Sequence, residues 1–208
     1  HIDDYALGSR VAGWMSKDYG INGYLYWSAA YYNGRLTYKD DYIDVYGDAS
    51  RENGSNGDSY LVYPGKYYGS EKPFPTNRLI AYRDSVDDYC MLSVLERELN
   101  AYAEKYAIAE GIDVNDYVRD IYDSLYTGSK YYTDDALLYQ AREELSRRIL
   151  ALRNEDDLIA ISERSASGVD TVIYTSLSTL TINGEDKNGV EQGEGYVYTV
   201  SQNLQEAK

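Results

Sequence analysis

The sequence has 208 residues, of which 35 are acidic and 20 basic, and its formal net charge is -15. A chain this acidic repels the phosphates of nucleic acids and the head groups of anionic lipids, so we expect neither as a partner. A neutral or cationic ligand agrees better with the charge. The alternative is that acidity simply keeps a secreted protein soluble. The length allows one or two domains.

Cys90 and His1 are the only cysteine and the only histidine. A single cysteine excludes an intrachain disulfide and thiolate zinc clusters, and the lack of an internal imidazole excludes Ser-His-Asp and Cys-His mechanisms. Cys90 has apolar neighbours in a predicted helix, so we interpret it as a small core residue. No metal site and no cofactor is predicted, because the acidic loop over residues 40–58 lacks the ligand spacing of a calcium loop.

Tyrosine is unusually frequent, with 26 tyrosines against one phenylalanine and two tryptophans. A tyrosine ring offers a flat apolar face and a hydroxyl that stays hydrated, a combination that suits contact with sugar rings. A compositional bias of the source genome is an equal alternative. The chain does not begin with methionine and contains neither a signal peptide nor an apolar stretch of about 18 residues. The simplest interpretation is that it was cut from a longer protein.

The first predicted element is a helix over residues 8–19, because apolar side chains recur there at helical spacing. Those side chains are Val11, Trp14 and Met15. Ser9 is a candidate cap, and the glycines at positions 20 and 23 end the helix. Residues 24–31, YLYWSAAY, are nearly all apolar, which predicts a strand buried on both faces, as in parallel sheets. A helix, a glycine loop and a buried strand make half of a βα repeat.

A loop over residues 33–58 follows, rich in glycine, asparagine and aspartate, and residues 59–63 are predicted to form a second strand. All three prolines lie in the next loop, residues 64–75. A long helix then runs from a cap at Thr76 or Asn77 to about residue 106. Its apolar face is predicted to consist of Leu79, Tyr82, Val86, Tyr89, Cys90, Leu92, Leu95, Leu99 and Tyr102.

Two further helices are predicted over residues 114–126 and 134–152. Thr133 is the expected cap of the second, and basic residues in its last turns favour the negative end of the helix dipole. Those residues are Arg147, Arg148 and Arg153. Neither helix contains a chemical motif, so we interpret both as packing elements.

The residue composition changes after residue 168. Residues 171–182 are rich in β-branched side chains, Asn183 and Gly184 form a hairpin-type turn, and residues 196–200 are expected to pair back. This tail is either the start of a β-sandwich or an edge hairpin on the helical region. A complete sandwich needs about seven strands, so the tail alone is not one.

Three segments of the first half resemble one known family. They are GWMSKDYGINGYLYWSAAYY (13–32), NGDSYLVYPG (56–65) and RLIAYRDSVDDYCML (78–92). In order, they are similar to the penultimate βα segment, the last strand and the closing helix of the catalytic barrel of glycoside hydrolase family 123, also filed as domain of unknown function 4091. The resemblance covers residues 1–106 and implies an α/β fold, the C-terminal repeats of a TIM-type (β/α)8 barrel. A helical extension over 107–165 and a β-rich tail over 166–208 would follow it.

Members of this family remove N-acetylhexosamine residues from glycans by substrate-assisted retaining catalysis, in which the acetamide of the sugar attacks the anomeric carbon. A consecutive Asp-Glu pair orients the acetamide and protonates the leaving group. No Asp-Glu dipeptide occurs in this sequence, so no catalytic residue is assigned to it. The resemblance implies a parent that hydrolyses N-acetylgalactosaminide-type linkages, with this chain inactive alone. The alternative is a non-catalytic carbohydrate-binding or cell-surface protein that retains the barrel.

The resemblance also indicates which residues contact the sugar. Barrel active sites lie at the carboxyl ends of strands, which places Tyr26, Trp27, Tyr31 and Tyr63 in the candidate site. Tyr26 and Trp27 match the Tyr-Trp-Ser of the family, although a tryptophan in a buried strand serves equally well as core packing. Ala30 stands where the family commonly has asparagine, so an amide that could bind a sugar hydroxyl is missing.

Four further residues that match the family are interpreted as structural. They are Asp58, Arg78, Arg83 and Asp84. Arg83 and Asp84 are expected to anchor the closing helix through ion pairs, and Asp58 to cap a turn. The implied partner is a glycan and the implied location is extracellular or at the cell surface. Exposed barrel edges would favour self-association, and the helical half has a weaker alternative interpretation as a protein-interaction module.

Overall fold

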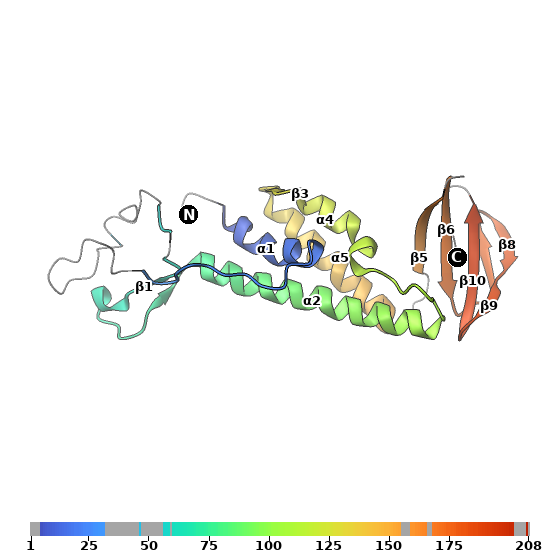
Figure 1. Ribbon diagram of the computed structural model, residues 1–208, viewed down its shortest axis with the longest axis horizontal. Coiled ribbons are helices and arrows are strands. Elements are labelled where there is room, and N and C mark those ends of the chain that lie inside the picture. Colours follow the sequence, from blue (N-terminus) through green and yellow to red (C-terminus); the bar gives the residue numbers. More distant parts are fainter. Residues whose placement is uncertain are drawn as a thin grey trace. The chain divides into compact units, whose positions relative to one another are not determined.

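The computed structural model describes residues 5–31, 46, 56–58, 60–154, 159–165, 168–201 and 207. The chain forms two compact units. Unit 1 consists of His1–Cys90 and Tyr122–Leu138, and unit 2 of Met91–Ile121 and Tyr139–Lys208. Helices dominate the chain up to α5, and strands dominate the residues after it (Figure 1). Within the described residues, no helix is both long and apolar enough to cross a membrane.

The first predicted helix is confirmed as α1 (Ala6–Asp18). Val11 and Trp14 are buried, as their spacing predicts. The predicted cap at Ser9 is wrong, because the helix begins three residues earlier and Ser9 lies inside it. The helix ends where the glycines predict, since Gly20 has a φ of 63°, a left-handed conformation that glycine adopts without strain.

The segment over residues 24–31 differs from the buried strand that its sequence predicts. It is irregular except for an isolated antiparallel bridge between Ala30 and Tyr60. Leu25 is 86% exposed and Trp27 is 50% exposed. A strand is buried on both faces when hydrogen-bonded neighbours and covering helices surround it. The described part of unit 1 supplies a single bridged neighbour, so the apolar side chains stay in contact with solvent. The barrel fold stays a prediction.

A small hairpin follows, made of β1 (Val62–Tyr63) and β2 (Phe74–Pro75). The second predicted strand is therefore present, but its ladder is two residues long. The connection between β1 and β2 contains the 3₁₀ helix η1 (Gly65–Tyr68). A side chain at Gly65 would meet the carbonyl oxygen of Lys72 at 2.0 Å, so this connection folds tightly on itself.

The long predicted helix is confirmed as α2 (Asn77–Lys105). Thr76 caps it as predicted, because its Oγ1 accepts the backbone N–H of Leu79 at 3.3 Å. The apolar face is correctly predicted in the second half of the helix, where the four predicted residues are buried. They are Leu92, Leu95, Leu99 and Tyr102.

The first half of α2 shows a different buried face from the one predicted. Val86 is 61% exposed and Cys90 is exposed, so the prediction of Cys90 as a core residue is wrong. The buried positions there are Ser85 and Asp88, which are polar. They are buried because α1 packs on this part of α2 and supplies hydrogen-bond partners for both.

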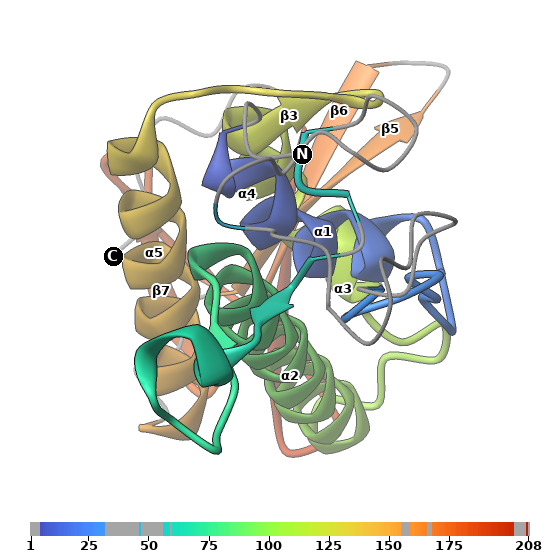
Figure 2. The same ribbon diagram turned by 90° about the vertical axis from the view of Figure 1, so that its left-hand side faces the viewer.

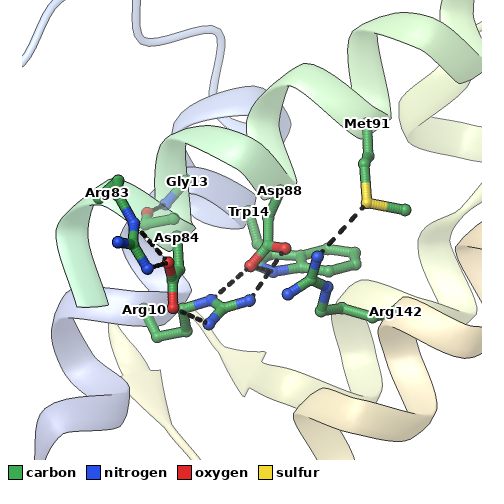
Figure 3. Close-up of polar contacts among 9 residues, drawn as sticks. Arg10, Gly13, Trp14, Arg83, Asp84, Asp88, Met91 and Arg142 are labelled. Atoms are coloured by element: carbon green, nitrogen blue, oxygen red, sulfur yellow. Dashed lines mark hydrogen bonds and ion pairs between the residues drawn. The ribbon is translucent and has the colours of Figure 1, made fainter. Parts of the chain in front are cut away.

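The contact between α1 and α2 centres on the carboxylate of Asp88, which is fully buried (Figure 3). Arg10 donates to it from Nε at 2.8 Å, and Trp14 donates from Nε1 at 3.0 Å. The Arg10 guanidinium also pairs with Asp84 at 3.0 Å. Gly13 brings the helices close together, since its backbone N–H donates to Ser85 Oγ at 2.6 Å. Figure 2 shows α1 crossing beside α2.

The helix predicted over residues 114–126 is present as two pieces, α3 (Val114–Tyr117) and α4 (Arg119–Leu125). A hairpin of β3 (Tyr126–Thr127) and β4 (Lys130–Tyr131) follows. The next predicted helix is α5 (Asp135–Arg153).

The cap of α5 is Asp134, whose carboxylate accepts the N–H of Ala136 at 3.0 Å, so the prediction of Thr133 is wrong by one residue. The arginines predicted near the helix end form ion pairs instead of acting on the dipole alone. Arg147 and Arg148 both bind Glu144, and together they hold the pKa of Glu144 at about 2.

The β-rich tail forms a four-stranded antiparallel sheet and a hairpin, both in unit 2. The sheet order is β5 (Ile159–Ser165), β6 (Gly168–Thr175), β10 (Gly195–Ser201) and β9 (Val190–Gln192). The prediction that residues 196–200 pair back is confirmed, because they pair with β6.

The hairpin of β7 (Thr179–Ile182) and β8 (Glu185–Asn188) turns at the predicted Asn183 and Gly184, whose φ values of 52° and 84° are positive. Its buried residues share a core with the sheet. That core consists of Ile173, Leu180, Ile182, Tyr198 and Val200. The sandwich interpretation of the tail stays a prediction.

The close approach of α1 to α2 predicts a large effect of Gly13→Ala. The new methyl group would meet the carbonyl oxygen of Ser85 at 2.0 Å. We expect a loss of about 1–3 kcal/mol in the free energy of unfolding, measured by urea denaturation, although alanine is the better helix former. The control is Gly23→Ala, which has open space around it and should change stability by less than about 0.5 kcal/mol. Equal effects of the two substitutions would contradict the packing described.

Candidate functional site

Two of the residues predicted to contact sugar meet on one carboxylate. The hydroxyl of Tyr26 donates to Asp58 Oδ1 at 2.7 Å, and Trp27 Nε1 lies 3.4 Å from each carboxylate oxygen of Asp58. The sequence analysis places Asp58 in a turn, and residues 56–58 do form one. Beyond that, the structure gives Asp58 a second role, because its carboxylate holds the two aromatic side chains in place.

The ring of Trp27 is paired with that of Tyr31. The two ring centroids are 5.2 Å apart and the planes are inclined by 56°. Half of the Trp27 side chain is exposed. Three of the four predicted sugar-contacting residues therefore lie together with Asp58, in an aromatic group that solvent reaches. We call Tyr26, Trp27, Tyr31 and Asp58 the Trp27 group.

Arg78, in the first turn of α2, fixes the backbone on both sides of Asp58. Its guanidinium donates to the carbonyl oxygen of Gly57 at 2.6 Å and to that of Tyr60 at 2.6 Å. A planar guanidinium binds two carbonyl oxygens in a defined geometry, which a lysine ammonium does not. Arg78 therefore links the start of α2 to the turn that carries Asp58.

The other predicted structural residues lie away from the Trp27 group. Asp84 joins α2 to α1 through its ion pair with Arg10. Arg83 is exposed and pairs with its neighbour Asp84 at 2.6 Å. An exposed ion pair of this kind contributes little stability.

Tyr63, the fourth predicted sugar-contacting residue, belongs to a separate aromatic group. Its ring centroid lies 5.1 Å from that of Tyr46 and 6.4 Å from that of Tyr60. No sequence motif singles out Tyr46. The remaining acidic residues of that loop, including Asp40 and Asp41, lie outside the described residues.

A groove of about 520 Å³ lies beside the Trp27 group, between α1, residues 21–26, Leu61 and α2. Tyr24 and Tyr82 share a hydrogen bond across it, with their hydroxyl oxygens 2.8 Å apart. Burial, and then this hydrogen bond, raise the pKa of Tyr24 above its ordinary value. No sequence signal predicts the pair, because the two residues are far apart in the chain. The described residues that line the groove offer apolar and hydroxyl contacts.

The chemistry that the Trp27 group supports is binding. Glycoside cleavage by the usual scheme needs two carboxyl groups on either side of the scissile bond. The hydrogen bonds described for this group involve one carboxylate, that of Asp58. In the described part of the chain, no cluster of three His, Cys, Asp or Glu residues could hold a metal ion. An aromatic platform beside a carboxylate acceptor suits a ligand that has an apolar face and hydroxyl groups.

A comparison with protein-family models found a match in the first part of the chain. Residues 2–95 match the glycoside hydrolase 123 catalytic domain. The resemblance is thereby confirmed for the part of the chain that contains α1, the Trp27 group and the first half of α2. This part is glycoside hydrolase-like, and the match supports a glycan as its ligand. No curated protein and no solved structure matched the chain.

The hydrogen bond to Asp58 predicts a specific change in the NMR spectrum. The protein has two tryptophans, and each indole N–H donates to a different carboxylate. In Asp58→Ala, the indole resonance of Trp27 should move upfield because its acceptor is lost. The resonance of Trp14, which donates to Asp88, should stay in place and serves as the internal control. A Trp27 resonance that is the same in both proteins would show that the bond is not formed.

Proposed function

We propose that this chain is the sugar-contacting C-terminal part of a glycoside hydrolase-like barrel. In this proposal the parent protein hydrolyses N-acetylhexosaminyl linkages of the N-acetylgalactosaminide type by substrate-assisted retaining catalysis. The observation that carries the proposal is the family match over residues 2–95, which contains the exposed Trp27 group. The acid pair that the chemistry needs is placed in an upstream part of the parent, because this chain has no Asp-Glu dipeptide.

The Trp27 group can bind a pyranose by two complementary contacts. The exposed face of the Trp27 ring covers the apolar face of the sugar, with Tyr31 beside it. Asp58 then accepts a hydrogen bond from a sugar hydroxyl. A carboxylate has about four acceptor positions, so Asp58 can do this while it also holds Tyr26. The chain thus contributes part of the wall of a sugar site.

The proposed barrel also accounts for the apolar side chains that this chain leaves exposed. Leu25 and Trp27 belong to a segment whose sequence predicts a buried strand. Neighbouring strands of a parent barrel would cover Leu25, which is exposed in this chain. Another copy of the chain could provide the same cover through self-association at these edges. The extracellular or cell-surface location is part of the same proposal.

A second candidate function is a carbohydrate-binding protein that retains the barrel without catalysis. Two observations favour it. Ala30 replaces an asparagine that the family commonly has, and the described hydrogen bonds of the Trp27 group involve one carboxylate. An Asp-Glu pair at the end of an upstream strand of the parent would favour the enzyme, and its absence would favour the binding protein.

We expect the chain alone to release no nitrophenol from p-nitrophenyl N-acetyl-β-galactosaminide above the spontaneous rate. The physical reason is that the carboxylic acid that would protonate the leaving oxygen lies, in this proposal, in the upstream part of the parent. The measurement is absorbance of released nitrophenolate, with and without protein. Turnover that disappears in Asp58→Ala would contradict the proposal, because it would place a catalytic carboxylate within this chain.

Sugar binding through Trp27 predicts that Trp27→Ala weakens the affinity for methyl N-acetyl-β-galactosaminide by about tenfold, which is about 1.4 kcal/mol. Trp27→Phe keeps an aromatic face and should lose less. The control is Tyr139→Ala, which removes another exposed aromatic side chain, on α5. Titration calorimetry of the full 208-residue chain gives the dissociation constants. Unchanged affinity in Trp27→Ala would show that the residue does not contact the sugar.

A further inference from the structure

Four aromatic side chains gather where the chain leaves β1. They are Tyr46, Tyr63, Tyr68 and Phe74. The ring centroid of Tyr46 lies 5.1 Å from that of Tyr63 and 5.0 Å from that of Tyr68, and the rings of Tyr68 and Phe74 are 6.2 Å apart. Tyr63 and Phe74 are also cross-strand partners in the β1–β2 hairpin, seen beside the β1 label in Figure 1. We call these residues the hairpin aromatic group.

The hairpin aromatic group is largely open to solvent. Tyr68 is 68% exposed, and Phe74 and Tyr46 are also exposed. Several aromatic rings that touch one another at the surface form a patch, and a contiguous exposed patch of this kind commonly marks a binding site. Three of the four rings are tyrosines, whose hydroxyls add hydrogen-bonding capacity at the rim of the patch.

The backbone beneath these rings is held in place without a ligand. The hydroxyl of Tyr46 donates to the carbonyl oxygen of Pro64 at 3.1 Å. Ser70 Oγ both donates to the carbonyl of Lys72, at 3.0 Å, and accepts its N–H, at 3.1 Å. The tight packing at Gly65 leaves no room for a side chain. A ligand would therefore meet a surface that is already ordered, which lowers the entropic cost of binding.

A hollow of about 690 Å³ lies in the same loop, between Pro64 and Pro73. Its lining includes the side chains of Lys66, Ser70 and Glu71. A hollow with one positive group, one negative group and a hydroxyl has both donors and acceptors but no dominant charge. That combination suits an uncharged ligand with many hydroxyl groups better than an anion or a cation.

The hairpin aromatic group connects to the Trp27 group through one bridge. The Tyr63 ring is 6.4 Å from that of Tyr60, and Tyr60 pairs with Ala30, the neighbour of Tyr31. Tyr31 in turn contacts Trp27. The two aromatic groups thus lie on two segments of unit 1 that a β-bridge joins, with the fully buried Tyr60 between them.

We propose that the hairpin aromatic group is a second carbohydrate subsite, which stacks on a further sugar unit of an oligosaccharide whose terminal unit lies on Trp27. This inference rests on the proposed function and extends it from a single sugar to a glycan chain. The physical basis is an exposed aromatic patch, a hollow of mixed polarity in the same loop, and a β-bridge that joins the neighbouring segment to the one that carries Trp27.

The test compares two probes on the full chain. They are methyl N-acetyl-β-galactosaminide and a tetrasaccharide that ends in β-linked N-acetylgalactosamine. Tyr68→Ala should weaken the tetrasaccharide by about tenfold and leave the monosaccharide unchanged. Trp27→Ala should weaken both. Tyr68→Phe keeps the ring and should behave like the wild type, and the high exposure of Tyr68 means that neither variant endangers folding.

The outcomes separate this inference from the proposed function. If Tyr68→Ala binds the tetrasaccharide as the wild type does, while Trp27→Ala does not, the second subsite is disproved and the proposed function stands. If Trp27→Ala leaves both affinities unchanged while Tyr68→Ala weakens the tetrasaccharide, the hairpin aromatic group binds glycan and the role of Trp27 is disproved. If the wild-type chain binds neither probe, both proposals are overturned.

Discussion

The buried carboxylate of Asp88 is the interaction on which unit 1 depends. A charged group with no access to water is tolerated only if it is paired and hydrogen-bonded, and Arg10 and Trp14 supply those bonds from α1. Removing one partner of such a buried pair typically costs about 3–5 kcal/mol, because the other charge is left uncompensated. Because Gly13 has no side chain, α1 and α2 approach closely enough for these bonds to form.

The two helices determine where the Trp27 group lies. α1 leads directly into residues 21–31, which carry Tyr26 and Trp27, and α2 begins just after the hairpin. From the first turn of α2, Arg78 holds the carbonyls on either side of Asp58. The aromatic residues come from one segment and the carboxylate from another, and the helix pair brings the segments together.

The sequence predicts the regular elements well where local rules decide them. Helical spacing identifies α1, α2 and α5, Thr76 is recognisable as a cap, and the Asn183-Gly184 pair predicts the hairpin of β7 and β8. Local rules do not predict a contact between residues that are far apart in the sequence. Nothing near Asp88 in the sequence indicates that Arg10, 78 positions earlier, pairs with it.

The same limit applies to the site. Tyr26 and Trp27 stand out in the sequence because they resemble a family motif, and both lie within the matched residues 2–95. Their shared acceptor, Asp58, is not recognisable, because it lies 32 and 31 positions away in the sequence. The sequence does not predict the exposure of Leu25 and Trp27. A run of apolar residues predicts burial, but it does not indicate which other elements would cover those residues.

The central claim is that this chain contacts sugar through Trp27 and Asp58. Chemical-shift mapping of the labelled chain during a titration with methyl N-acetyl-β-galactosaminide tests it most directly. The account predicts that the indole N–H of Trp27 and the backbone amides of residues 26–31 and 58 shift together and saturate with one dissociation constant. Shifts confined to other residues, or none at saturating sugar, would contradict it.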